Sequence, residues 1–223
     1  MTNPFKDKNL VRGAWYVAAL LAAAACGGKS AENQQPTPAP TQPLPLAGLA
    51  SVKVPVLPLT LLAFDDSLPW ASSFADRRAA LGIADSILGT LLQGRGPEVT
   101  WILPEELRRQ ARRSPTFAAN PDQMGTAILR GAKVGDFLPD PLRSELRALV
   151  AIADARHALV PAQLVYRRMA GAADGRMGTA ELTVVIVDAR LGQVGFKTVA
   201  RGDGTDPWTA LTRAVKALTP GLP

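Results

Sequence analysis

A run of closely spaced prolines limits what the early part of this chain can fold into. Five prolines fall within the ten positions from Pro36 to Pro45, in a stretch between Lys29 and Leu49 that carries almost no charge. Proline lacks a backbone N–H and fixes φ, so the run disfavours helix and sheet and favours an extended polyproline II path. We expect a spacer of about 24 residues that reaches roughly 70 Å at ~3.1 Å per residue. A partner that binds the prolines themselves is the less favoured alternative.

The residues before this run have the pattern of an export signal. Lys6, Lys8 and Arg12 precede an uncharged, largely apolar stretch from Ala14 to Ala25. A basic segment followed by a short apolar one is typical of a secretory signal peptide. The stretch has 12 residues, too few to cross a bilayer core, which takes roughly 17 to 25 residues. We therefore expect residues 1–25 to be removed on export.

The only cysteine of the chain, Cys26, follows this stretch directly. The segment Leu20–Cys26, with small residues at Ala24 and Ala25, resembles the lipobox of bacterial lipoproteins, although alanine stands where leucine is most common three positions before the cysteine. The resemblance implies a diacylglyceryl group on the Cys26 thiol. Glycine rather than aspartate follows the cysteine, which by the same resemblance implies an outer-membrane anchor facing the periplasm. The alternative is cleavage by ordinary signal peptidase, which would leave a soluble periplasmic protein with a free thiol.

These features divide the chain into three predicted parts. Residues 1–25 are the lipoprotein signal peptide, residues 26–50 are the lipidated N-terminus with its Pro-rich linker, and residues 51–223 are a periplasmic α/β domain. About 170 residues suffice for one hydrophobic core. Without the three basic residues and one acid of the signal, 22 Lys and Arg remain beside 18 Asp and Glu, so the net charge is about +4.

One dense basic cluster lies in the domain. It consists of Arg108, Arg109, Arg112 and Arg113. No aromatic residues interleave with these arginines, so the cluster does not have the pattern of a nucleic-acid interface, and we expect no nucleic-acid partner. A solvated helix face is the preferred interpretation.

The rest of the chain alternates between strand-like and helix-like patterns. Strands are expected at 52–64, 99–103, 158–166, 180–188 and 194–200, and a turn at 171–178. Helices are expected at 70–93 and 104–112, after Asp140-Pro141 and after Asp206-Pro207. Prolines at 55 and 58 are expected to interrupt the first strand. In the first helix, Arg77, Arg78 and Asp85 are expected to lie away from the apolar face. This order predicts one α/β sandwich domain, with a mixed sheet of about five strands and helices packed on it.

Four segments of the domain resemble a superfamily of periplasmic domains. They are the first strand from Val54, the segment from Ala158, the strand pair 182–196 with Asp188, Ala189 and Gly192 at its turn, and the final helix from Asp206. The superfamily includes the curli-secretion-channel lipoproteins, the TolB amino-terminal domain and the lipoprotein activators of peptidoglycan synthases. The resemblance implies a non-catalytic binding or assembly module for a periplasmic or outer-membrane protein, with self-association as an alternative. It carries over no catalytic residue.

An enzymatic role is the competing hypothesis. His157 is the only histidine, which removes most catalytic triads and the histidine-based zinc sites. Asp65 and Asp66 follow the first strand, so they could serve a small envelope hydrolase as a carboxylate pair or hold a hard cation. Turn formation is the commoner role of such a pair. We therefore predict no catalytic residue, no cofactor and no metal site, and Cys26 as the one modified residue.

Overall fold

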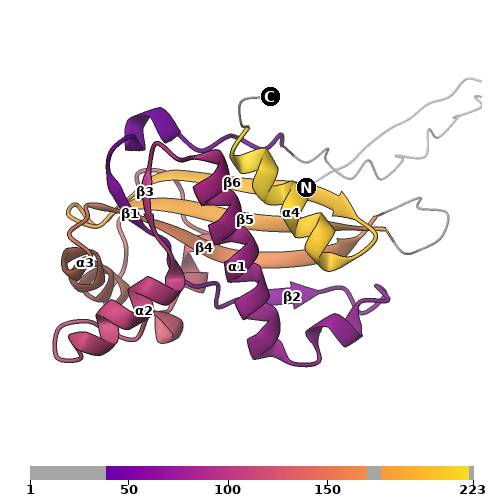
Figure 1. Cartoon of the computed structure of the whole chain (residues 1–223), viewed down its shortest axis with the longest axis horizontal. Helices are drawn as coiled ribbons and strands as arrows, with labels where there is room; N and C mark the ends of the chain where they lie inside the picture. The colour runs from indigo at the N-terminus through magenta and orange to yellow at the C-terminus, as the bar shows by residue number, and fades with distance from the viewer. Residues whose placement is uncertain (1–38, 170–176, 221–223) are drawn as a thin grey trace, which may run out of the picture. The chain divides into compact units, whose positions relative to one another are not determined.

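Three long strands form the centre of the structure (Figure 1). β4 (His157–Arg168), β5 (Gly178–Asp188) and β6 (Gln193–Gly204) pair antiparallel in chain order. β2 (Leu62–Phe64) lies parallel to β4, so the strand order is β2-β4-β5-β6. The computed structural model describes residues 39–169 and 177–220. The predicted α/β class with a mixed sheet is confirmed, with four strands in the main sheet and a separate parallel pair, β1 (Lys53–Pro55) and β3 (Thr100–Ile102).

The first predicted strand is broken in two, as its prolines suggest. β1 pairs with β3, and β2 resumes beside β4 after a gap of six residues. Val56 donates to the carbonyl of Ile102 at 2.8 Å and Leu57 to that of Leu159 at 2.9 Å, after which Pro58 offers no N–H. The backbone N–H of Leu59 therefore lies outside the sheet ladders and needs another acceptor.

Helices cover both faces of the main sheet. α1 (Arg77–Arg95) and α4 (Pro207–Leu218) pack on one face (Figure 1). Val184 and Ile186 belong to the same core cluster as the buried residues of these helices. α2 (Pro104–Arg113) and α3 (Leu142–Ile152) pack with Val185 and Val187, which belong to the second core cluster. Successive side chains of a strand point to opposite faces of the sheet. Because helices cover both faces of β5, its residues from Val184 to Val187 are all apolar.

Several element boundaries differ from the prediction. α1 begins at Arg77 with Asp76 as its cap, seven residues later than expected, because Trp70 leads into a short 3-10 helix instead. Asp140 does not cap α3, which has no side-chain cap, whereas Asp206 caps α4 by accepting the N–H groups of Trp208 and Thr209, both at 3.0 Å. The four 3-10 helices are η1 (Leu46–Leu49), η2 (Ala71–Phe74), η3 (Pro121–Gln123) and η4 (Thr126–Arg130).

The last twelve residues assigned to the linker pack against the domain. Residues 39–50 run beside β6 and α4, drawn in indigo in Figure 1. The side chains of Leu44 and Leu49 are buried, and Leu44 donates its N–H to the carbonyl of Leu218 at 2.8 Å. The Thr41 hydroxyl contacts Val199 O at 3.3 Å and the N–H of Arg201 at 3.2 Å. Proline spacing alone gave no sign of these contacts, because the buried leucines lie between the prolines.

Other expectations fall on parts of the chain without a described structure. The signal peptide, Cys26 and the start of the linker lie before residue 39, and most of the predicted turn at 171–178 lies within 170–176. The signal, the anchor and that turn therefore stay predictions. In the residues that the structure describes, no helix has the length and apolar character needed to span a membrane.

Candidate functional site

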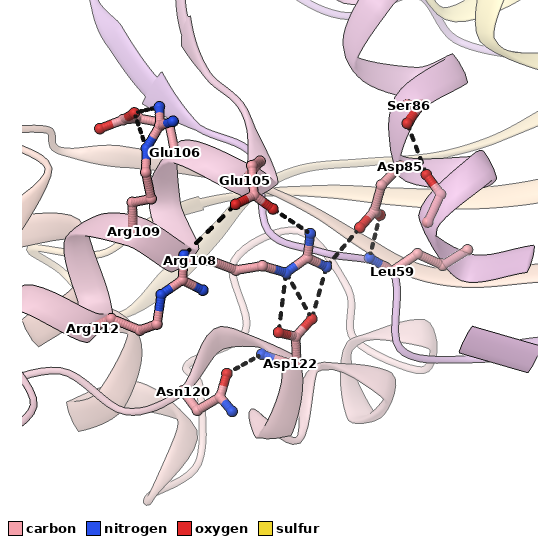
Figure 2. A network of polar contacts seen from close by, with 11 residues as sticks. Leu59, Asp85, Ser86, Glu105, Glu106, Arg108, Arg109, Arg112, Asn120 and Asp122 are labelled. Carbon is pink, nitrogen blue, oxygen red and sulfur yellow. Dashed lines mark hydrogen bonds and ion pairs between the residues drawn. The ribbon is translucent and has the colours of Figure 1, made fainter. Parts of the chain in front are cut away.

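A buried carboxylate on α1 fills the gap left by the broken strand. Asp85 is only 6% exposed. Its Oδ1 accepts the backbone N–H of Leu59 at 2.8 Å, and its Oδ2 accepts Arg108 Nη2 at 2.9 Å (Figure 2). The expectation that Asp85 lies away from the apolar face is wrong. Asp85 stands four residues after Leu81 and three before Leu88, which puts all three on one side of the helix.

Arg108 joins three separate segments through one guanidinium group. Besides Asp85 it contacts Asp122, which accepts Nε at 3.0 to 3.1 Å and Nη2 at 2.7 Å (Figure 2). Asn120 orients this turn by accepting the N–H of Asp122 at 3.1 Å. The guanidinium therefore connects α1, α2 and the turn that begins η3. A planar guanidinium with five donors is suited to two carboxylates in this way, whereas the point charge of lysine is not.

Burial sets the electrostatics of this network. Burial raises the pKa of Asp85 to about 6, although the Leu59 N–H and the Arg108 guanidinium both favour its charged form. The hydrogen bonds from Arg108 to Asp122, followed by those to Asp85, raise the pKa of Arg108 despite partial burial. Arg108 thus stays a cation at every pH at which the protein is folded. The sequence gave no direct sign that this arginine is partly buried, so the prediction of a wholly solvated cluster is wrong for Arg108.

An open groove of ≈690 Å³ lies beside the network and has arginines on both walls. Arg77 and Arg78 come from α1, and Arg108 and Arg112 come from α2. The remaining polar residues that line it are Thr60, Glu105, Asn120, Asp122 and Gln123. We call this set of residues the arginine groove.

The four arginines of the groove differ in how far their charges are already compensated. Arg108 has three carboxylate partners, Asp85, Asp122 and, at 3.9 Å, Glu105. Arg77 donates to the carbonyl of Leu62 at 3.0 Å. Arg112 is exposed and lies 3.6 Å from Glu105, a surface contact of the kind that contributes little. Within residues 39–169 and 177–220, Arg78 makes no side-chain hydrogen bond or ion pair. Arg78 and Arg112 are therefore available to an anionic group, which guanidinium binds in a two-pronged manner.

Asp65 and Asp66 lie in an exposed turn after β2. The Asp65 carboxylate accepts the N–H of Ser67 at 2.9 Å, and its carbonyl accepts the N–H of Leu68 at 3.0 Å. The hydrogen bond from Ser67 lowers the pKa of Asp65. Asp65 therefore stabilises the turn, and these contacts do not support a hydrolase. Across the described ranges, no three His, Cys, Asp or Glu side chains are grouped so that they could hold a metal ion.

His157 lies beside a carboxylate that has a structural role. Its Nε2 lies 3.8 Å from the Asp188 carboxylate, and burial lowers the pKa of His157. Asp188 in turn accepts Arg156 at 2.6 Å and the N–H groups of Arg190 and Leu191, both at 3.0 Å. This carboxylate therefore closes the β5–β6 turn, and the histidine beside it has no nucleophile to activate among these contacts.

Comparisons with known proteins give similar structures but no family. No family model matches the chain, and no curated protein sequence does so. A solved PelC dodecamer from Paraburkholderia phytofirmans is similar at a TM-score of 0.37 and 15% identity over 82% of this chain and 92% of that one. The LpoB C-terminal domain from Salmonella enterica aligns at 0.34 and 12% identity over 68% and 82%, and E. coli LpoB, solved by NMR, at 0.31 and 11% over 89% and 88%.

At these TM-scores the similarity assigns no partner, assembly state or residue role to this chain. Those questions depend on the contacts of its own residues.

Proposed function

We propose that this chain is a lipid-anchored, non-catalytic binding module of the bacterial envelope, held by Cys26 at the outer membrane and facing the periplasm. The anchor proposal rests on the sequence from Lys6 to Gly27. The Pro-rich segment that leads to Ala39 serves as the spacer. Extended at ~3.1 Å per residue, residues 26–38 would reach roughly 40 Å, less than the full linker would.

The proposed docking surface is the arginine groove, and the proposed partner is an acidic surface of another envelope protein. One observation carries this proposal. Arg108 is fixed by Asp85 and Asp122, whereas Arg112 has only an exposed contact with Glu105 and Arg78 has no carboxylate partner among the described residues. A rigid framework with cations that are not yet compensated binds an anionic group with little reorganisation. The groove contains carboxylates only at Glu105 and Asp122.

Charge reversal at one of two neighbouring arginines tests this docking surface. Arg112→Glu is expected to weaken copurification of the partner from detergent-solubilised envelopes by about tenfold or more, because a cation that faces the partner becomes an anion. Arg113→Glu is the matched control, since it changes the same charge on the same helix but lies outside the groove. The measurement is the amount of partner retained per molecule of bait, by quantitative mass spectrometry. Equal losses for both variants would show that net charge matters and the groove does not.

The anchor has its own test. Cys26→Ser removes the thiol that would carry the diacylglyceryl group, so the variant is expected to leave the detergent phase in phase partitioning or to accumulate as a precursor. Two or more acyl chains give stable membrane attachment, so the parent should stay in the detergent phase. If parent and variant partition alike, the anchor proposal is wrong and the alternative of a soluble periplasmic protein replaces it.

A further inference from the structure

Three large apolar side chains are exposed together at one end of the main sheet. Val134 is 62% exposed, Phe137 68% and Leu191 51%. Val134 and Phe137 belong to the segment that leads to α3, and Leu191 lies in the β5–β6 turn. The two segments are joined by backbone hydrogen bonds of 2.8 Å, from Gly135 to the carbonyl of Val194 and from Leu138 to the carbonyl of Gly192. We call Val134, Phe137 and Leu191 the sheet-end patch.

The patch is surrounded mainly by basic residues. These are Lys133, Arg143, Arg147 and Arg190, with Asp136 and Asp140 as the nearby acids. Arg147 donates to the carbonyl of Arg190 at 2.9 Å, and the Arg143 side chain packs under Gly192. Asp188 at the β5–β6 turn is a further acid, but it pairs with Arg156 at 2.6 Å, so cations still outnumber acids at this end of the sheet. Exposed apolar groups of this size usually mark a contact surface, and the sign of the charge indicates an anionic partner.

The chain enters the domain beside the second half of β6, and Val134 is the patch residue that shares a cavity with this point. Ala39 and Pro40 line the same cavity of ≈400 Å³ as Lys133 and Val134. Arg201 Nη1 fixes the entry point by donating to the carbonyl of Ala39 at 2.7 Å. Cys26 lies thirteen positions before Ala39. A spacer of this length reaches roughly 40 Å when extended, which is long enough for the patch to meet the bilayer.

We propose that the sheet-end patch contacts the anionic phospholipid surface in which the chain is anchored. This inference rests on the proposed anchor at Cys26. Aromatic and aliphatic tips enter the boundary between headgroups and acyl chains, while lysine and arginine remain among the lipid phosphates. A second copy of this chain is a poorer occupant, because symmetric pairing would place like charges against each other. Contact at the patch would hold the domain at the membrane with a defined side facing outward.

Photo-crosslinking of the full-length chain tests this proposal. A photoreactive benzoylphenylalanine replaces Phe137, and the protein is reconstituted into vesicles of phosphatidylethanolamine with about one quarter phosphatidylglycerol. Replacement of Phe117 is the matched control, because that phenylalanine is 76% exposed but lies between α2 and η3. We expect lipid adducts at position 137 to exceed those at position 117 by about fivefold or more, as expected for an apolar side chain that enters the bilayer.

Two further measurements make the outcome decisive. Lys133→Glu combined with Arg190→Glu should reduce the lipid adducts at position 137 several-fold in the anionic vesicles and leave them unchanged in vesicles of phosphatidylethanolamine and phosphatidylcholine. The mass of the Cys26 peptide shows separately whether the anchor is present, so failure of the anchor is distinguished from failure of the patch. Two outcomes would overturn the proposal: equal lipid adducts at positions 137 and 117, or adducts at position 137 to protein instead of lipid. Either outcome counts against the patch whether or not Cys26 is acylated.

Discussion

Asp85→Ala is expected to lower the free energy of unfolding by about 2 to 4 kcal/mol at pH 7, because two groups lose their acceptor at once. The N–H of Leu59 would remain buried without a partner, since Pro58 and the gap between β1 and β2 remove it from the sheet. Arg108 would keep Asp122 and the longer contact with Glu105. Loss of one member of a buried ion pair often costs more, but the remaining contact with Asp122 limits the effect here.

The control for this variant uses the other carboxylate of the same arginine. Asp122 is 45% exposed, so Asp122→Ala is expected to cost about 1 kcal/mol or less, as surface ion pairs do. Urea unfolding of both variants gives the comparison. If the two variants are equally destabilised, the hydrogen bond from Leu59 to Asp85 contributes nothing to stability, and the Leu59 N–H finds another acceptor in the variant.

The pKa of Asp85 also predicts how the free energy of unfolding changes with pH. Burial raises the pKa of Asp85 from 3.8 to about 6, so the folded state binds this proton more tightly than the unfolded chain. The resulting contribution to stability is complete below about pH 4 and disappears as the pH rises through about 6. Two pKa units correspond to about 3 kcal/mol. Relative to Asp85→Asn, which cannot titrate, the parent should therefore lose stability from pH 4 to pH 7, and a gain over this range would mean that Arg108 dominates.

The sequence predicts the elements of this fold better than it predicts the site. The apolar run from Ala180 to Asp188 predicts a strand, and the structure has β5 there. Pro104 predicts the start of α2, and Asp206 predicts the cap of α4. These signals are local, because one residue and its near neighbours decide them.

The arginine groove could not be derived in the same way, because its residues come from four separate parts of the chain. Asp85 is close to Leu59 only after the first strand breaks at Pro58, and Arg108 meets Asp122 only after the turn at Asn120 folds back. The one signal that the sequence did offer is the position of Asp85 among Leu81, Ala84 and Leu88 on the apolar side of α1. A carboxylate at such a position requires a partner, and the nearest cluster of cations in the sequence is that of α2.

Gly202→Ala is expected to cost about 3 kcal/mol or more, because α4 lies directly against the backbone of β6. A Cβ atom at Gly202 would be 2.5 Å from the carbonyl oxygen of Ala210 and closer still to the N–H of Ala214. Both are backbone atoms of a helix, so no side chain can move aside. The whole helix would have to shift, and with it the buried Leu211 and Leu218 that complete the core on this face.

Gly195→Ala is the matched control on the same strand. A Cβ atom there would lie 3.7 Å from the carbonyl oxygen of Ile186, an ordinary contact. This variant is expected to be neutral or slightly stabilising, because alanine loses less backbone entropy than glycine on folding. Thermal and urea unfolding should therefore separate two identical substitutions seven positions apart on β6. Similar stability for both would show that α4 does not pack on β6 this closely, and would leave the small residues at Gly202, Ala210 and Ala214 without a structural reason.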